Sequence, residues 1–383
     1  VYMAGKRFGL RAFAGNFQRD EINEAVEYAH SINKKVYVTM NIFAHNEDFK
    51  DMDEYMKFLS KIGVDAAIIS DPGILSLARE AMPNVPIHMS TQANNTNWRS
   101  AKFWHEQGVK RIILARELSL NEIGQIRENV PDTLEIETFV HGAMCISYSG
   151  RCLLSNVFTG RDANRGQCAH PCRWKYSIVE EKRPGEYYPV LEDDRGTYIM
   201  NSKDLCMLGH IPQLMGTGID GFKIEGRMKS SYYVATVVQA YRREMDAYLE
   251  DQDGYRWDPK AIAEIQKASH RAYTTGFYFK KPAGEDHQYS DSSYIRNYDF
   301  VGMVLGYDKE RGLMEVEQRN AFEVGDVLEI MMPGEDYMDY TVTTILDEEG
   351  RPINRAPHPQ QRVYLPLDRG ITGYSILRRE QKV

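Results

Sequence analysis

The chain has 383 residues, of which 42% are hydrophobic and 27% charged, and its formal net charge is −8 at pH 7. This length is enough for one large and one small domain, each with a buried core. No apolar run approaches the ~20 residues of a membrane-spanning helix, and the acidic balance excludes a protein coated evenly in positive charge. We therefore expect a globular protein of the cytoplasm that does not insert into membranes.

Strands alternate with amphipathic helices along residues 1–254, the predicted first domain. The sequence opens with Val1, and because residues 1–4 already have the character of a strand, we expect an upstream strand to be missing. Further strands are predicted at 35–41, 66–70, 87–92, 111–116, 135–142, 198–201 and 221–225. This α/β alternation predicts a parallel sheet covered by helices, and the number of repeats favours a closed (β/α)8 TIM-barrel-like domain.

Several helix ends carry recognisable signals. Asp20 is expected to cap a helix, Pro72 to open another, and Ser119 with Glu122 to form a capping box. A long amphipathic helix is predicted at 231–249, still within the first domain. The sequence therefore predicts a helix after most strands of the first domain.

The composition changes after residue 254. Residues 255–297 are polar and rich in Tyr, Lys and Gly, and we expect them to form a connecting segment. Residues 298–383 contain short strands separated by turn signals such as Pro333-Gly334 and Glu349-Gly350. Short strands without helices predict a small all-β barrel as the C-terminal domain.

A cysteine-rich loop region at 142–206 holds every cysteine of the chain, namely Cys145, Cys152, Cys168, Cys172 and Cys206. Glycine and proline around them favour irregular loops, on which thiolates typically bind an iron–sulfur cluster or zinc. The alternative is five unrelated buried thiols. Disulfides are disfavoured because the number is odd and no signal peptide is visible. The spacing of the cysteines indicates a metal site but does not identify the metal.

Chemistry in barrels of this type sits at the carboxyl ends of the strands. The predicted strand ends carry Asn41, Asp71, Gln92, Glu117, His141, Lys203, Asp204, Glu225 and Arg227. Between Cys145 and Tyr176, basic residues are interleaved with aromatic ones, which suits phosphates and unstacked bases. The alternatives are strand-end caps and surface ion pairs for the first set, and an ordinary solvated loop for the second.

Residues 137–145 read Glu-Thr-Phe-Val-His-Gly-Ala-Met-Cys, and residues 150–155 read Gly-Arg-Cys-Leu-Leu-Ser. This pattern closely resembles the signature of the collagenase-like peptidase family, also called the peptidase U32 family. Residues 5–11, 201–205 and 222–230 look like the same family, as does the C-terminal β-module. The chain is most similar to the branch of prephenate-dependent tRNA uridine 5-hydroxylases.

The resemblance implies an iron–sulfur enzyme that hydroxylates the wobble uridine of tRNA to 5-hydroxyuridine with prephenate as co-substrate. It also implies a 4Fe–4S cluster whose ligands are Cys145, Cys152, Cys168 and Cys206, so that Cys172 is not a ligand. After preparation in air, we expect that zinc can replace the cluster. The two carboxylates of prephenate call for guanidinium partners, for which Arg7, Arg11 and Arg227 are candidates. Candidates for catalysis are His141, Lys203, Asp204 and Glu225. Arg161, Arg165, Arg173 and Lys175 are expected to contact the RNA.

Two other functions stay open. A peptidase would need an activated thiolate beside a histidine, as Cys145 with His141 or Cys172 with His170 would offer. No Gly-x-Ser-x-Gly or His-Glu-x-x-His motif is present in the sequence. A zinc-bearing RNA-binding protein without catalysis is the third reading, and assembly with itself or with a paralogue is also open.

Overall fold

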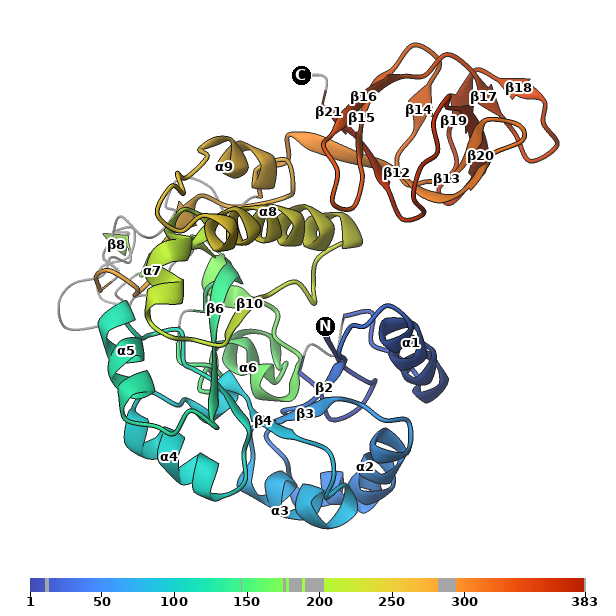
Figure 1. Ribbon diagram of the computed structural model, residues 1–383. Coiled ribbons are helices and arrows are strands. Elements are labelled where there is room, and N and C mark those ends of the chain that lie inside the picture. The colour runs from blue at the N-terminus through green and yellow to red at the C-terminus, as the bar shows by residue number, and fades with distance from the viewer. Residues whose placement is uncertain are drawn as a thin grey trace. The chain divides into compact units, whose positions relative to one another are not determined.

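The computed structural model describes residues 1–10, 14–145, 147–174, 177–178, 188–189, 203–281 and 294–381. The chain, drawn as a ribbon in Figure 1, divides into an α/β unit, residues 1–229 with 271–293, and a C-terminal unit, residues 230–270 with 294–383. Neither unit is continuous in sequence, whereas the sequence alone predicted boundaries at 254 and 297. Arg11, Lys175 and the predicted strand at 198–201 lie outside the described residues.

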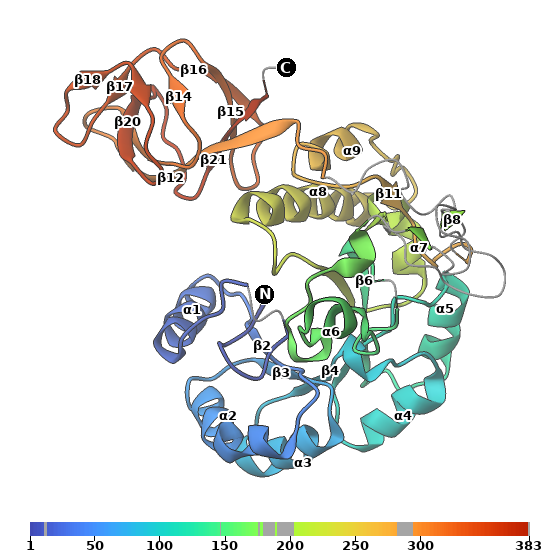
Figure 2. The ribbon, with the colours of Figure 1, turned by 180° about the vertical axis from the view of Figure 1, so that it is seen from behind.

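Seven parallel strands form the centre of the α/β unit. In order across the sheet they are β1 (Tyr2–Met3), β2 (Tyr37–Met40), β3 (Ala66–Ile69), β4 (Ile87–Met89), β5 (Arg111–Ile113), β6 (Glu135–Ala143) and β10 (Gly221–Ile224). The helices between the first six are α1 (Arg19–Ser31), α2 (Met52–Lys61), α3 (Pro72–Ala81), α4 (Trp98–Glu106) and α5 (Leu120–Glu128). Figure 2 shows them around the outside of the strands. The predicted parallel α/β architecture is confirmed.

The two ends of this sheet approach each other through a side chain. The Tyr2 hydroxyl on β1 lies 3.4 Å from the carbonyl oxygen of Ile224 on β10. No ladder of backbone hydrogen bonds joins β1 to β10 among the described residues. Instead, β9 (Asp204–Cys206) pairs antiparallel with β6, and β11 (Tyr273–Thr274) continues the sheet beside β9. Closure into an eight-stranded barrel is therefore not seen in this part of the chain.

Helix starts follow the predicted signals with one correction. Asp71 accepts a hydrogen bond from the Ile74 amide at 3.0 Å with Pro72 in the first turn, and the Ser119 capping box is present. The cap of α1 is Gln18 rather than Asp20. Asp20 lies in the first turn, where its charge offsets the positive end of the helix dipole.

Two helices and an antiparallel sheet make up the C-terminal unit. The helices are α8 (Ser231–Glu250) and α9 (Lys260–Ile265). The sheet orders β16 (Met338–Thr341), β15 (Val327–Met331), β21 (Ile376–Glu380), β12 (Tyr298–Asp308), β13 (Leu313–Gln318), β20 (Arg362–Pro366), β17 (Ile345–Leu346) and β18 (Pro352–Ile353). The core includes Val304, Val316, Leu328 and Leu365. The predicted β-rich module is thus present, and α9 lies in the predicted connecting segment.

Buried ion pairs join the helices of this unit to its sheet. The guanidinium of Arg378 on β21 is fully buried and contacts Glu264 on α9 and Glu329 on β15. Lys267 also contacts Glu329, at 2.8 Å. No helix in the described residues combines the length and apolarity needed to cross a membrane.

Candidate functional site

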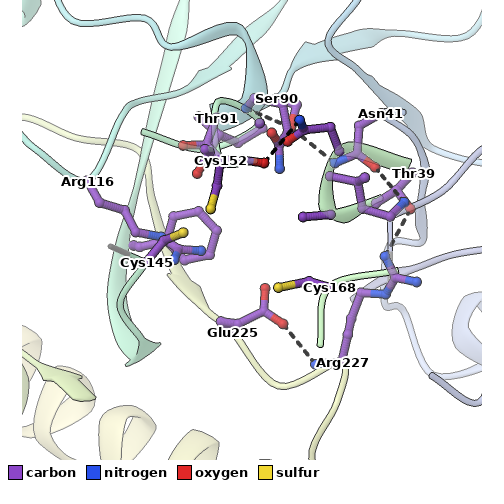
Figure 3. Close-up of a pocket in the computed structure, with 18 of the residues that line it drawn as sticks. Thr39, Asn41, Ser90, Thr91, Arg116, Cys145, Cys152, Cys168, Glu225 and Arg227 are labelled. Atoms are coloured by element: carbon purple, nitrogen blue, oxygen red, sulfur yellow. Dashed lines mark hydrogen bonds between the residues drawn. The ribbon is translucent and has the colours of Figure 1, made fainter. Parts of the chain in front are cut away.

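A cavity of about 110 Å³ opens at the carboxyl ends of the parallel strands (Figure 3). The strand ends contribute Asn41, Ser90, Gln92, Arg116, Glu225 and Arg227. The loops that follow β6 contribute Cys145, Cys152, Cys168 and Cys172. The parallel topology therefore brings polar strand-end residues and cysteine loops together, as expected for this architecture.

Four of the five thiols share this pocket. Cys145 is exposed, and Cys152, Cys168 and Cys172 are partly buried. Cys206 is 7% exposed on β9, opposite His141 of β6, and does not line the cavity. No three His, Cys, Asp or Glu side chains of the described residues are close enough to hold one metal ion. In softness and number, however, the gathered thiols fit a thiolate-bound metal group.

Two glycines of the sequence signature permit this close packing. Gly142 has φ +117°, and a Cβ there would lie 2.8 Å from the backbone oxygen of Glu225. Gly150 has φ +75°, and a Cβ there would overlap the side chains of Gln92 and Phe43. The positive φ disfavours other residues at both positions, and at Gly142 a side chain would also collide with the backbone of Glu225. Glycine therefore lets the end of β6 approach β10, and lets the cysteine loop approach the ends of β2 and β4.

Glu225 is the acidic residue of the described pocket lining. Its carboxylate accepts a hydrogen bond from the Tyr2 hydroxyl at 3.2 Å and from the Arg227 amide at 3.2 Å. Burial, together with the Glu225 charge, holds the pKa of Tyr2 well above its ordinary value. Tyr2 therefore stays protonated and donates to Glu225, which keeps the carboxylate oriented at the pocket.

Arg227 and Arg116 place two guanidinium groups at the same cavity. Arg227 donates to Asn16 at 2.7 Å and to Thr39 at 3.4 Å. Arg116 donates to the carbonyl of Ala143 at 2.8 Å, and its guanidinium carbon lies 4.0 Å from the centre of the Phe139 ring. Sequence reasoning missed Arg116, which it placed as the last residue of a strand. A cation directly after the apolar run 112–115 was the available signal.

Largely buried on the sheet, three charged residues, Glu137, Lys223 and Arg111, form an ion-pair network where apolar side chains are more usual. Glu137 is 5% exposed and accepts from Lys223 at 2.6 Å and from Arg111 at 2.8 Å. Burial disfavours its charged form, but these two cations outweigh burial, so the pKa of Glu137 lies below its ordinary value. Nearby, burial and the Arg111 charge lower the pKa of His88 to about 3, so its imidazole is neutral at pH 7.

Several predicted site residues lie away from the cavity. His141 is 1% exposed and packs against the Tyr273 ring, with ring centres 5.5 Å apart. Asp204 is 1% exposed and accepts from the Arg271 amide at 3.3 Å. Arg7 forms an exposed ion pair with Asp51 at 2.7 Å. Neither these residues nor Lys203 line the pocket.

The predicted RNA-contacting residues are described in part. Arg161 is exposed, whereas Arg165 forms a two-pronged ion pair with Asp48 at 2.9 and 3.1 Å. For Arg173 the structure describes only the backbone. Tyr148, Phe158 and Trp174, three of the aromatic residues interleaved with these basic ones, are each 46% exposed.

A cysteine peptidase needs a histidine in reach of its thiolate. None of the described residues that line the pocket is a histidine. Because His141 is buried against Tyr273 instead, the predicted pairing of Cys145 with His141 at an open site finds no support in this geometry.

Comparison with known protein families divides the chain once, between residues 288 and 296, so that α8 and α9 fall in the first family model although they belong to the C-terminal unit of the structure. Residues 1–288 match the family model for peptidase family U32, and residues 296–378 match that for the peptidase family U32 C-terminal domain. The chain is 41% identical over 379 residues to "tRNA hydroxylation protein P1" of Bacillus subtilis (strain 168), which covers 99% of this chain and 89% of that protein.

Two further relatives carry other names. An "uncharacterized protease" of Methanocaldococcus jannaschii is 41% identical over 86% of this chain and 81% of its own length. The "23S rRNA 5-hydroxycytidine C2501 synthase" of Escherichia coli (strain K12) is 33% identical over 80% of this chain and 45% of its own length. The resemblance seen at residues 137–155 is confirmed, and the chain belongs to peptidase family U32.

Proposed function

We propose that the protein is an iron–sulfur RNA hydroxylase of the cytoplasm, which converts the wobble uridine of tRNA to 5-hydroxyuridine with prephenate as co-substrate. The observation that carries this proposal is the pocket in which four thiols meet a carboxylate and two guanidinium groups. Relatives whose names state tRNA hydroxylation and rRNA hydroxycytidine synthesis support the reaction type.

Cys145, Cys152, Cys168 and Cys206 are the proposed ligands of a 4Fe–4S cluster, which would supply one-electron chemistry. The first three line the pocket. Cys206 belongs to the neighbouring strand pair, where its register partner is His141, four residues before Cys145. Cys172 also lines the pocket, so the choice of the fourth ligand between Cys172 and Cys206 needs a direct test.

The remaining pocket residues have separate tasks in this proposal. A base must leave its stack before it can enter a site at the strand ends. The amides of Asn41 and Gln92 and the hydroxyl of Ser90 offer donors and acceptors for the edge of such a base. Glu225, held by Tyr2 and Arg227, would accept or return a proton at its carboxylate.

The loop surface would hold the RNA around the target nucleotide. Tyr148, Phe158 and Trp174 offer exposed rings on which unpaired bases can stack. Arg161, Arg173 and Lys175 would neutralise phosphates beside them. Arg165 is already neutralised by Asp48, so its main contribution would be to hold the loop near that residue.

Mass spectrometry of nucleosides from tRNA of a deletion strain tests the function. Loss of 5-hydroxyuridine derivatives, restored by the wild-type gene but not by a Cys145→Ala gene, is the expected result. Unchanged 5-hydroxyuridine in a strain that also lacks any paralogue would refute the hydroxylase. Iron and zinc analysis of anaerobically purified protein separates it from the zinc-bearing alternative.

A further inference from the structure

Arg116 differs from the other cations near the pocket in what balances its charge. Lys223 is neutralised by Glu137 at 2.6 Å, and Arg165 by Asp48. Arg116 donates to a neutral carbonyl oxygen and stacks on an aromatic ring. Among the described residues, no carboxylate lies within ion-pair distance of it, and its Nε is buried without a hydrogen-bond partner.

A partly buried guanidinium without an ion-pair partner is stabilised when an anion pairs with it. Arg116 lines the cavity, and Figure 3 shows it and Arg227 entering from opposite sides. The Phe139 ring beneath and the Ala143 carbonyl fix the direction of the Arg116 fork. A planar anion with two oxygens matches such a fork better than a point charge would.

We propose that Arg116 binds a carboxylate of a small organic acid in this pocket. A small acid is favoured over an RNA phosphate because Arg116 is partly buried and its Nε is buried inside the pocket, away from the exposed loop surface that would face the RNA backbone. The assignment rests on the proposed function, to which it adds the recognition of the co-substrate.

Calorimetric titration of the full-length, anaerobically purified protein tests this assignment. Prephenate carries two carboxylates, phenylpyruvate carries one, and inorganic phosphate represents the RNA backbone. Arg116→Gln should weaken prephenate binding by about tenfold to a hundredfold, because a charge-assisted bidentate contact is lost. The affinity of Arg116→Lys for prephenate should lie between those of wild type and Arg116→Gln, because lysine keeps the positive charge but cannot form the two-pronged contact. Arg99→Gln is the matched control: Arg99 is exposed and stacks on Trp98 at 4.5 Å, away from the pocket.

The outcomes separate this inference from the proposed function. Prephenate binding by Arg116→Gln within about twofold of wild type, at equal iron content and melting temperature, would overturn the inference and leave hydroxylation standing. If Arg116→Gln lost phosphate or tRNA binding but kept prephenate binding, the inference would also be overturned, and Arg116 would be a phosphate contact. Failure of the wild type to bind either acid would remove both the inference and the co-substrate. Arg116-dependent binding in a protein whose deletion leaves 5-hydroxyuridine unchanged would support the inference and refute the hydroxylase.

Discussion

Replacing Glu225 by glutamine should abolish turnover while leaving the fold almost intact. The change removes one negative charge and keeps the shape of the side chain. Glutamine still offers an oxygen to one of the two donors, the Tyr2 hydroxyl and the Arg227 amide, each 3.2 Å from the carboxylate. It cannot take or return a proton, so the reaction should lose the contribution of a positioned acid–base group, about 10²–10⁴-fold.

The expected cost in stability is small. One hydrogen bond to a charged acceptor is worth about 1.5 kcal/mol, and both bonds to Glu225 are long. A domain of this size loses about 2–4 °C in melting temperature per kcal/mol, so the variant should melt about 3–6 °C below wild type.

Glu137→Gln provides the matched control, because it makes the same chemical change in a buried carboxylate outside the pocket lining. Glu137 lies between Lys223 and Arg111, and its loss removes the ion pair of the buried Lys223, whereas Arg111 keeps Glu135 at 2.7 Å. Breaking a buried ion pair in this way costs about 3–5 kcal/mol. This variant should therefore be much less stable, with activity lost in proportion to unfolding.

The assay is 5-hydroxyuridine formed per folded molecule, with melting followed by circular dichroism. Activity of Glu225→Gln within about threefold of wild type would refute its role in proton transfer. A large loss of stability with full activity in the remaining folded fraction would make Glu225 a structural anchor instead.

Three further predictions address the cluster, the RNA and the C-terminal unit. Alanine at Cys145, Cys152, Cys168 or Cys206 should strip iron and sulfide from anaerobically purified protein, whereas Cys172→Ala should not; iron lost with Cys172 but kept without Cys206 would reverse that choice. Reversing Arg161, Arg173 and Lys175 to glutamate should weaken tRNA binding and lower its salt dependence, while Arg165→Ala alone should change neither much, and equal affinity and salt slope in the triple variant would refute the RNA contact. Lys267 and Arg378 outweigh burial and lower the pKa of Glu329, so its stabilising contribution is present above its ordinary pKa of 4.5 and is lost as the pH falls through the lower folded-state value. The stability difference between wild type and Glu329→Gln should therefore shrink on acidification in thermal unfolding, and a difference independent of pH would contradict the linkage.

Repeating patterns were readable from the sequence, and contacts between distant residues were not. Apolar spacing located α2, whose Met52, Tyr55, Met56 and Leu59 are all buried. Strand β11 has two residues and no pattern of its own, because its pairing with β9 defines it. Helix α8 was predicted within the first domain but belongs to the C-terminal unit, because an amphipathic pattern does not identify the surface on which the helix packs.

The arginines show the same limit within the site. The sequence analysis selected Arg7 as a candidate carboxylate-binding residue and missed Arg116, because only the fold decides where a long side chain points. Arg7 finds Asp51, 44 residues away, whereas Arg116 lies over Phe139 at the cavity. The thiols were easier to predict, because loops that leave one sheet edge gather regardless of detailed side-chain geometry.

The discontinuity of the two units affects how the chain can fold during synthesis. After Lys229 the chain enters the C-terminal unit, at Arg271 it returns to add β11 beside β9, and after Ser293 it leaves again. Helices α8 and α9 therefore emerge from the ribosome before the α/β unit is complete and before the sheet that completes their own unit exists. The α/β unit therefore cannot be completed until the first part of the C-terminal unit has been made, because β9, which carries Cys206, lacks its neighbour β11 until Tyr273 is made 67 residues later.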